Sequence, residues 1–245
     1  MTWSIVARDP ETGYFGIAIA TRFFAVGALC PWTEAKVGAL STQATMNPLL
    51  GPRGLALLRE GNPAPAALEM LMRGDEGRAI RQVHLIDAAG RSAAYTGAEC
   101  IDWAGQRADA GISVAGNMLV GAAVIEETLD AYRANLNTPF VERLLLAMDA
   151  GEAAGGDKRG RQSAALVIQG PEPYRRLDMR VDDHAEPLTE LRRLYGVARQ
   201  HFIPFSRGFP TAERPYGITE RAVIDKIVER DAGKPLEIDA PIPEA

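Results

Sequence analysis

The sequence predicts an α+β protein in which two antiparallel sheets are stacked between layers of helices. Three observations predict this class. Runs typical of strands and of helices follow one another in blocks, instead of alternating singly as in a βαβ fold. Residues 14–20 are apolar on both parities, which is typical of a strand that is covered on both faces. Turn residues separate neighbouring strands, which favours antiparallel hairpins.

The first half of the chain is predicted to hold two hairpins and two helices. The first hairpin joins strands at 3–8 and 14–20 through a turn at 9–13 that is rich in turn-forming residues. A third strand is expected at 36–44. Two helices follow. The helix at 53–60 ends before a glycine, and the helix at 64–73 begins with proline in and before its first turn. The second hairpin pairs 80–87 with 91–96 across a turn closed by glycine.

The second half is predicted to hold three more strands and four more helices. A strand over 111–116 ends at Asn117, and two helices with apolar residues at helical spacing cover 121–135 and 138–150. A strand at 164–169 pairs with 176–181. Helices are expected at 187–201 and, within a proline-rich stretch, at 219–230. We expect one domain over residues 1–202, and a partly helical extension over 203–245 that packs on it.

Composition limits the classes of function. The 245 residues are 47% hydrophobic and 24% charged, as in an ordinary globular protein. The net charge of −5 does not favour binding to nucleic acid or to an anionic membrane. The chain has neither a bilayer-spanning apolar run nor a signal-peptide pattern, and Cys30 and Cys100 fit a reducing compartment. We therefore predict a cytoplasmic protein without a nucleic-acid or membrane partner.

Thr2 is the first candidate for catalysis. If Met1 is removed, Thr2 carries a hydroxyl beside a free α-amino group, at the start of a predicted buried strand. Such an amine has a pKa of about 8, so it can serve as general base for its own hydroxyl. A small residue at position two is common in any protein, and a plain first strand is the competing interpretation. Chain ends usually fray, and this one is predicted not to.

Polar and basic residues at other predicted strand ends are further candidates. Gly116–Asn117 is a plausible oxyanion-binding element, although a simple turn is the more frequent role of Gly-Asn. Gln43 and Asn47 lie near another strand end. Arg22 and Lys36 are basic residues near strand ends, and either can lower the pKa of a nucleophile or bind a substrate carboxylate.

A glycine-rich, charged segment over 155–163 precedes the strand at 164–169. Its glycines allow close approach of backbone N–H groups to a ligand, and Arg159 and Arg161 can bind a carboxylate. A phosphate loop is excluded, because Gly-Lys-Ser/Thr is missing and a strand follows instead of a helix. A solvated turn, with Asp157 paired to one of the arginines, is the alternative.

The sequence contains no recognisable metal or cofactor motif. The three histidines are far apart, and Asp182–His184 is interpreted as a surface loop. Zinc spacing, a dinucleotide fingerprint and a nucleophile elbow are all missing. We therefore expect neither a metal nor a cofactor.

These motifs together resemble the bacterial family called domain of unknown function 1028, which is grouped with the N-terminal-nucleophile (Ntn) hydrolases. The resemblance covers residues 2–202 and rests on five stretches, namely 2–13, 22–27, 43–54, 116–117 and 155–165. It implies a four-layer αββα sandwich with Thr2 in the nucleophile position. The other candidates are placed by analogy of position.

The resulting hypothesis is an amide- or peptide-bond hydrolase. Thr2 would be the nucleophile, with Asn117 and Lys36 as its catalytic partners. Arg22, Gln43, Asn47, Asp157, Arg159 and Arg161 would bind the substrate. The substrate would be a small amide or a short peptide, and a homodimer is expected. The alternative is an Ntn-like scaffold without catalysis that binds a small molecule or assists assembly.

Overall fold

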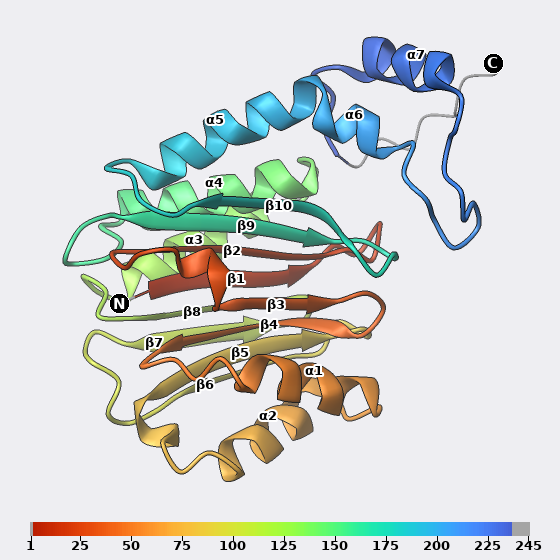
Figure 1. Ribbon diagram of the computed structural model, residues 1–245. Helices are drawn as coiled ribbons and strands as arrows, with labels where there is room; N and C mark the ends of the chain where they lie inside the picture. The colour runs from red at the N-terminus through yellow and green to blue at the C-terminus, as the bar shows by residue number, and fades with distance from the viewer. Residues whose placement is uncertain (1, 237–245) are drawn as a thin grey trace. The chain divides into compact units, whose positions relative to one another are not determined.

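The computed structural model describes residues 2–236 of the chain (Figure 1). Residue contacts divide the chain into two compact units, Met1–Leu191 and Arg192–Ala245. Among the described residues the fold is a mixed α+β arrangement with two antiparallel sheets and seven α-helices. The division falls inside helix α5 (Pro187–Gln200), before the boundary at 202–203 that the sequence predicts.

The larger sheet contains the first strand of the chain near its centre. Its order is β10-β9-β2-β1-β8-β7. The strands are β1 (Thr2–Arg8), β2 (Phe15–Thr21), β7 (Gly105–Asp109), β8 (Ile112–Asn117), β9 (Ser163–Gln169) and β10 (Arg175–Val181). β1 pairs with β2 and β8, so neither side of β1 is a sheet edge.

The smaller sheet has the order β3-β4-β5-β6. Its strands are β3 (Pro31–Glu34), β4 (Gly38–Ala44), β5 (Arg81–Asp87) and β6 (Ser92–Thr96). β4 and β5 contact β1, β2 and β8 of the larger sheet, so the two sheets face one another. Val6, Phe15 and Ile17 of the larger sheet pack there against Ala39 and Ile86 of the smaller one.

Helices cover the outer face of each sheet in the larger unit (Figure 1). Helices α1 (Leu50–Arg59) and α2 (Ala64–Arg73) pack on the smaller sheet. Helices α3 (Ala123–Ala134) and α4 (Phe140–Ala153) pack on the larger sheet. Gly16 allows close packing of α4 on β2, because a Cβ there would lie 2.5 Å from Leu144 Cδ1.

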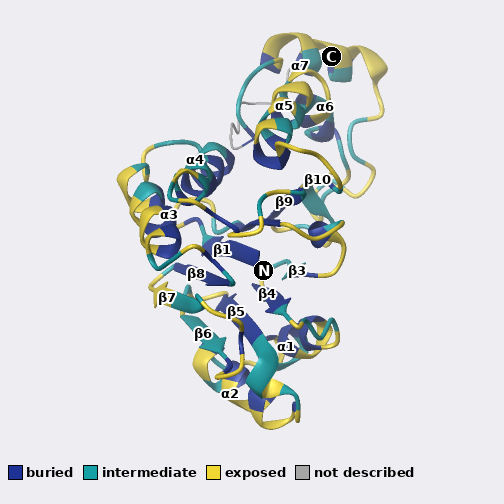
Figure 2. Ribbon diagram, turned by 90° about the vertical axis from the view of Figure 1, so that its left-hand side faces the viewer, coloured by how far each residue is buried: buried dark blue, intermediate teal, exposed yellow. Residues whose placement is uncertain are grey.

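Strand alternation decides which β1 residues face the other sheet. Ser4 contacts Ser41 and His84 of the smaller sheet, so even-numbered residues of β1 point between the sheets. Trp3 lies against Gly151 and Gly156, at the end of α4 and in the loop after it. Figure 2 shows β1 as a buried element. Thr2 therefore enters the space between the sheets from the end of β1.

Most predicted elements are present, with ends that differ by a few residues, but two short strands and one short α-helix were not predicted. β3 has only four residues and begins with proline. β7 reads Gly-Gln-Arg-Ala-Asp and lies at a sheet edge, where polar residues suit a strand that is open to solvent. Helix α6 (Phe202–Ser206) contains Pro204 in its first turn, where the missing N–H costs no helical hydrogen bond.

The second unit contains the end of α5, α6 and α7 (Arg221–Asp231). Within it, Phe209 packs edge-on against Phe202 and Phe205. The buried Asp231 carboxylate pairs with Arg207, Arg230 and Lys234. In the described part of the chain, no helix has the length and apolar character needed to cross a bilayer.

Candidate active site

Thr2 is the first residue of β1, and its side chain is buried, with 7% of the residue exposed. On one side it pairs in register with Asn117 of β8. On the other side its Oγ1 donates a hydrogen bond to Oγ1 of Thr21, the last residue of β2, at 3.1 Å. Three neighbouring strands thus meet at their ends around this hydroxyl group, which gives it a fixed environment.

Two side-chain amides approach the main chain of Thr2. Gln43 Nε2 and Asn117 Nδ2 lie 3.5 and 3.4 Å from the Thr2 carbonyl oxygen. Both amides donate shorter hydrogen bonds, of 2.8 and 3.0 Å, to Gln82 Oε1. Gln82 is itself fixed because its Nε2 donates to the Gly116 carbonyl at 2.8 Å. The three amides therefore hold the backbone at Thr2.

A cavity of about 60 Å³ opens beside the Thr2 side chain. It is lined by Thr2, Phe23, Val26, Cys30, Gln43, Ala44 and Met46. None of these lining residues carries a formal charge. Cys30 is buried, and its Sγ lies 3.6 Å from Met46 Sδ. Burial raises the pKa of the Cys30 thiol to about 12, so this thiol is protonated at neutral pH.

A buried polar layer continues from this cavity between the sheets. Ser4 Oγ donates to Gln43 Oε1 at 2.6 Å and lies 2.7 Å from His84 Nε2. Since the Ser4 proton is used towards Gln43, the network assigns the His84 proton to Nε2. Nδ1 of His84 then accepts from Ser113 Oγ at 3.1 Å. Burial lowers the pKa of His84 to about 3, so the ring is neutral.

The glycine-rich segment packs beside the end of β2. The carboxylate of Asp157 accepts from the Arg22 backbone N–H at 2.8 Å and from the Arg159 backbone N–H at 2.9 Å. The Arg159 guanidinium lies 3.2 Å from the same carboxylate, and the Arg22 guanidinium donates to the Arg159 carbonyl. Because Arg22 follows Thr21 directly, two exposed arginines gather next to the strand end that contacts Thr2.

Three predicted site residues are not brought to Thr2. Lys36 lies in the β3–β4 turn, at the opposite end of β4 from Gln43, and a strand of this length spans roughly 20 Å. Arg161 pairs with Glu152 and Glu186. Asn47 accepts the Leu49 N–H at 3.1 Å, in the turn before α1. Lys36 lies away from Thr2 because a strand has two ends, and it is the Gln43 end of β4 that lies beside Thr2.

Several residues of the site were missed in the sequence. Thr21 had a detectable signal, because it continues the inward-facing series Phe15, Ile17 and Ile19 of β2. Gln82 had a weaker signal, because Gln82 and His84 alternate with the apolar residues Val83 and Leu85 along β5. Cys30 and Met46 had none, since only the stacking of the two sheets brings them next to Thr2.

The family model described as a family of unknown function, DUF1028, matches residues 2–191. The crystal structure of protein SPO2555 from Silicibacter pomeroyi, which is described by the same family model, is similar to this chain with a TM-score of 0.83 and 32% sequence identity. The match covers 89% of this chain and 99% of that chain. Anbu (ancestral beta-subunit) from Yersinia bercovieri has a TM-score of 0.39 and 11% identity, covering 80% and 94%, a likeness too low to carry an argument. Among curated proteins no match was found.

Proposed function

This chain belongs to DUF1028, a family whose function is unknown, and we propose from its own geometry that it hydrolyses amide or peptide bonds with Thr2 as an N-terminal nucleophile. The observation that carries the proposal is the position of the Thr2 hydroxyl. It lies at the end of a buried central strand and lines a cavity. The stacked sheets and their helix layers support the αββα sandwich expected of an Ntn hydrolase.

The reaction requires removal of Met1, which converts the Thr2 backbone nitrogen into an amine. Thr2 Oγ1 then attacks the substrate carbonyl, and the amine takes the hydroxyl proton. Collapse of the tetrahedral intermediate breaks the C–N bond, and the leaving amine receives that proton. Water next attacks the acyl ester and restores the Thr2 hydroxyl.

The lining of the cavity supports the α-amine as the general base. The described lining residues are uncharged, and the Cys30 thiol is protonated because burial raises its pKa to about 12. His84 is neutral, but both of its ring nitrogens are engaged by serines between the sheets. A terminal amine has an ordinary pKa of about 8. The rate should therefore rise with pH through a single ionisation near that value.

Strand geometry supports the backbone N–H of Ala44 as the oxyanion donor. Along β4, the Thr42 N–H donates to the Cys30 carbonyl on the β3 side, and the Thr45 N–H donates to the Ile80 carbonyl on the β5 side. N–H directions alternate along the extended part of β4, so the Ala44 N–H, which precedes the left-handed bend at Ala44 (φ 68°), points to the same side as that of Thr42. On that side, β3 does not extend far enough to lie beside Ala44. Ala44 also lines the cavity.

Asn117 has a different proposed role from the one the sequence indicates. Its amide contacts the Thr2 carbonyl and Gln82, and it is not among the residues that line the cavity. We assign it to positioning of Thr2 rather than to the oxyanion. Arg22 and Arg159 are retained as a site for a substrate carboxylate, since both are exposed and lie beside the strand end that contacts Thr2.

The test uses two forms of the protein, one that begins at Thr2 and one that retains Met1. Each is treated with a set of β-lactones, strained esters that acylate hydroxyl nucleophiles, and the N-terminal peptide is weighed by mass spectrometry. We expect an adduct on Thr2 only in the form that begins at Thr2, and none in Thr2→Ala. Equal labelling of both forms, or labelling that survives Thr2→Ala, would show that the mechanism is wrong.

A non-catalytic scaffold is the second candidate, and the cavity gives it support. About 60 Å³ admits only a small group, and no charged side chain lines it in the described part of the chain. Intact mass spectrometry of the protein from its native host separates the two candidates. Retention of Met1 there would favour the scaffold, because the Thr2 amine would be blocked.

A further inference from the structure

A hollow of about 610 Å³ lies between α2 and β6, on the helix-covered face of the smaller sheet. It is separate from the Thr2 cavity. Tyr95 lines the hollow and packs with the core under α1 and α2, whereas the next residue, Thr96, accepts from Gln82 between the sheets. Successive strand residues point to opposite faces, so the smaller sheet stands between the two sites.

The walls of the hollow are mostly apolar. Leu68 and Met72 lie one turn apart on α2, so they share one face of the helix. Ala93 and Tyr95 lie two residues apart on β6, so they share one face of the strand. These two faces form opposite sides of a trough whose volume falls in the range of small-molecule sites, about 300–1,000 Å³.

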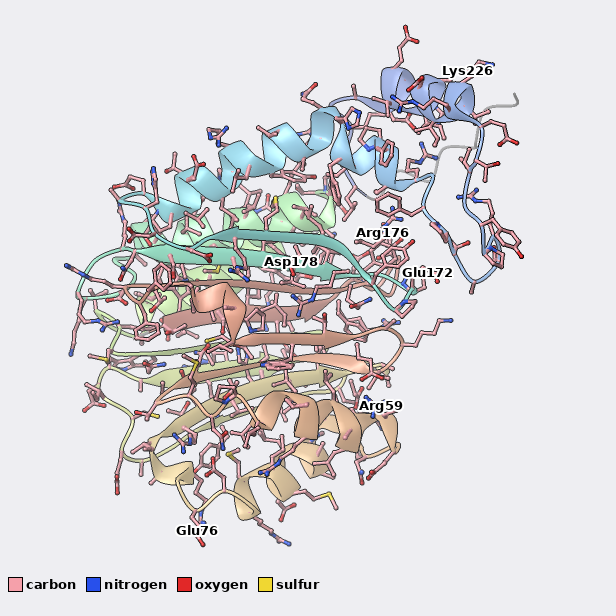
Figure 3. All side chains as sticks on the ribbon, in the orientation of Figure 1. Arg59, Glu76, Glu172, Arg176, Asp178 and Lys226 are labelled. Carbon is pink, nitrogen blue, oxygen red and sulfur yellow. The ribbon has the colours of Figure 1, made fainter. Side chains whose placement is uncertain are left out.

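Two arginines line the same hollow, and they differ in their partners. Arg73 pairs with Glu69, which also lines the hollow, so the charges of these two side chains offset one another. Arg78 belongs to the short helix η2 (Arg78–Ile80), and its guanidinium has neither a hydrogen bond nor an ion pair among residues 2–236. The nearby Asp75 carboxylate is already paired with Arg81 at 3.1 Å. Glu76 points outward in Figure 3 and does not line the hollow.

We propose that this hollow binds a small amphipathic carboxylate, with its apolar chain or ring against Leu68, Met72 and Tyr95 and its carboxylate on Arg78. Apolar walls favour the removal of a hydrocarbon group from water. A guanidinium matches a carboxylate with two parallel N–H donors, which selects the acid over an alcohol or an amine of equal length. The ligand is independent of the chemistry at Thr2.

The test is calorimetric titration of the full chain with sodium octanoate, and with 1-octanol as an uncharged probe of the same length. We expect saturable binding of octanoate that is at least about tenfold tighter than that of octanol. Arg78→Gln should weaken octanoate about tenfold and leave octanol unchanged. Ala93→Trp should abolish the binding of both, because the indole fills the trough.

Arg53→Gln is the matched control. Arg53 is an exposed arginine that lines a smaller hollow, of about 310 Å³, between α1 and α2. Its substitution should leave octanoate affinity unchanged, and equal losses in Arg53→Gln and Arg78→Gln would overturn the assignment. So would equal affinity for octanoate and octanol, or a lack of saturable binding. If Ala93→Trp instead dissociates a dimer, the trough is an interface between two copies and the proposal is wrong.

Discussion

The buried histidine between the sheets gives the stability of this protein a defined dependence on pH. His84 is fully buried, its Nε2 lies 2.7 Å from Ser4 Oγ, and its Nδ1 lies 3.1 Å from Ser113 Oγ. Burial lowers the pKa of the ring from 6.5 to about 3. The folded protein therefore keeps His84 neutral at a pH where the unfolded chain protonates it.

The sign and the size of the effect follow from proton linkage. Between about pH 3 and pH 6.5 the unfolded state binds one more proton at His84 than the folded state does, so stability falls as the pH falls. The contribution is fully present above pH 6.5. From pH 7 to pH 5 the free energy of unfolding should decrease by about 2 kcal/mol through His84 alone, at ~1.4 kcal/mol per pH unit below 6.5.

The assay is urea unfolding at pH 7 and at pH 5, followed by tryptophan fluorescence. The three tryptophans, Trp3, Trp32 and Trp103, all lie in the unit Met1–Leu191, so the signal reports the unit that holds His84. His84→Gln removes the titrating group. Between pH 7 and pH 5, the free energy of unfolding of the His84→Gln variant should fall by about 2 kcal/mol less than that of the wild type.

His184→Gln is the control, because His184 is exposed in a loop. It should show the same dependence on pH as the wild type. The comparison is made within each variant, so a general destabilisation caused by the substitution does not enter it. If His84→Gln and the wild type lose the same stability between pH 7 and pH 5, the explanation by burial is refuted.

Three further predictions concern packing, charge and reactivity. Asp9→Ala should cost roughly 3–5 kcal/mol of unfolding free energy, because it leaves the buried Arg143 guanidinium, 3.1 Å away, without its carboxylate. In urea unfolding, Arg143→Met in the same chain should recover part of that loss. Gly16→Val should cost about 1–3 kcal/mol, since its Cβ would lie 2.5 Å from Leu144 Cδ1, and an unchanged urea midpoint would contradict the packing of α4. Cys30 should be alkylated by iodoacetamide at pH 8 roughly a thousandfold more slowly in the folded than in the unfolded protein, because burial raises its pKa from 9.0 to about 12. Peptide mass spectrometry measures this, and comparable rates would contradict the burial.

Local pattern was sufficient for most of the fold. Helix α2 occupies the predicted residues 64–73, because its apolar spacing and its two prolines act within one turn of the chain. The edge strand β7 was missed for the converse reason. Its five residues include three polar ones and no large apolar side chain, and they become a strand only because β8 lies beside them.

The site was less predictable than the fold. The resemblance to DUF1028 is confirmed, and Thr2, Gln43 and Asn117 do meet at one point. The sequence could not decide among the basic residues, since Lys36 lies in the turn before β4 and Gln43 lies near the other end of that strand. The homodimer and the substrate stay predictions.

The sequence by itself determined that Thr2 begins a buried strand, because that property depends on the apolar run directly behind it. The tertiary structure alone decided what surrounds its hydroxyl group. Thr21 arrives through pairing of β1 with β2, whereas Cys30, Ala44 and Met46 arrive through the stacking of two sheets. Hydrophobic periodicity specifies which face of a strand is buried, but it does not specify which residues of another sheet it will meet.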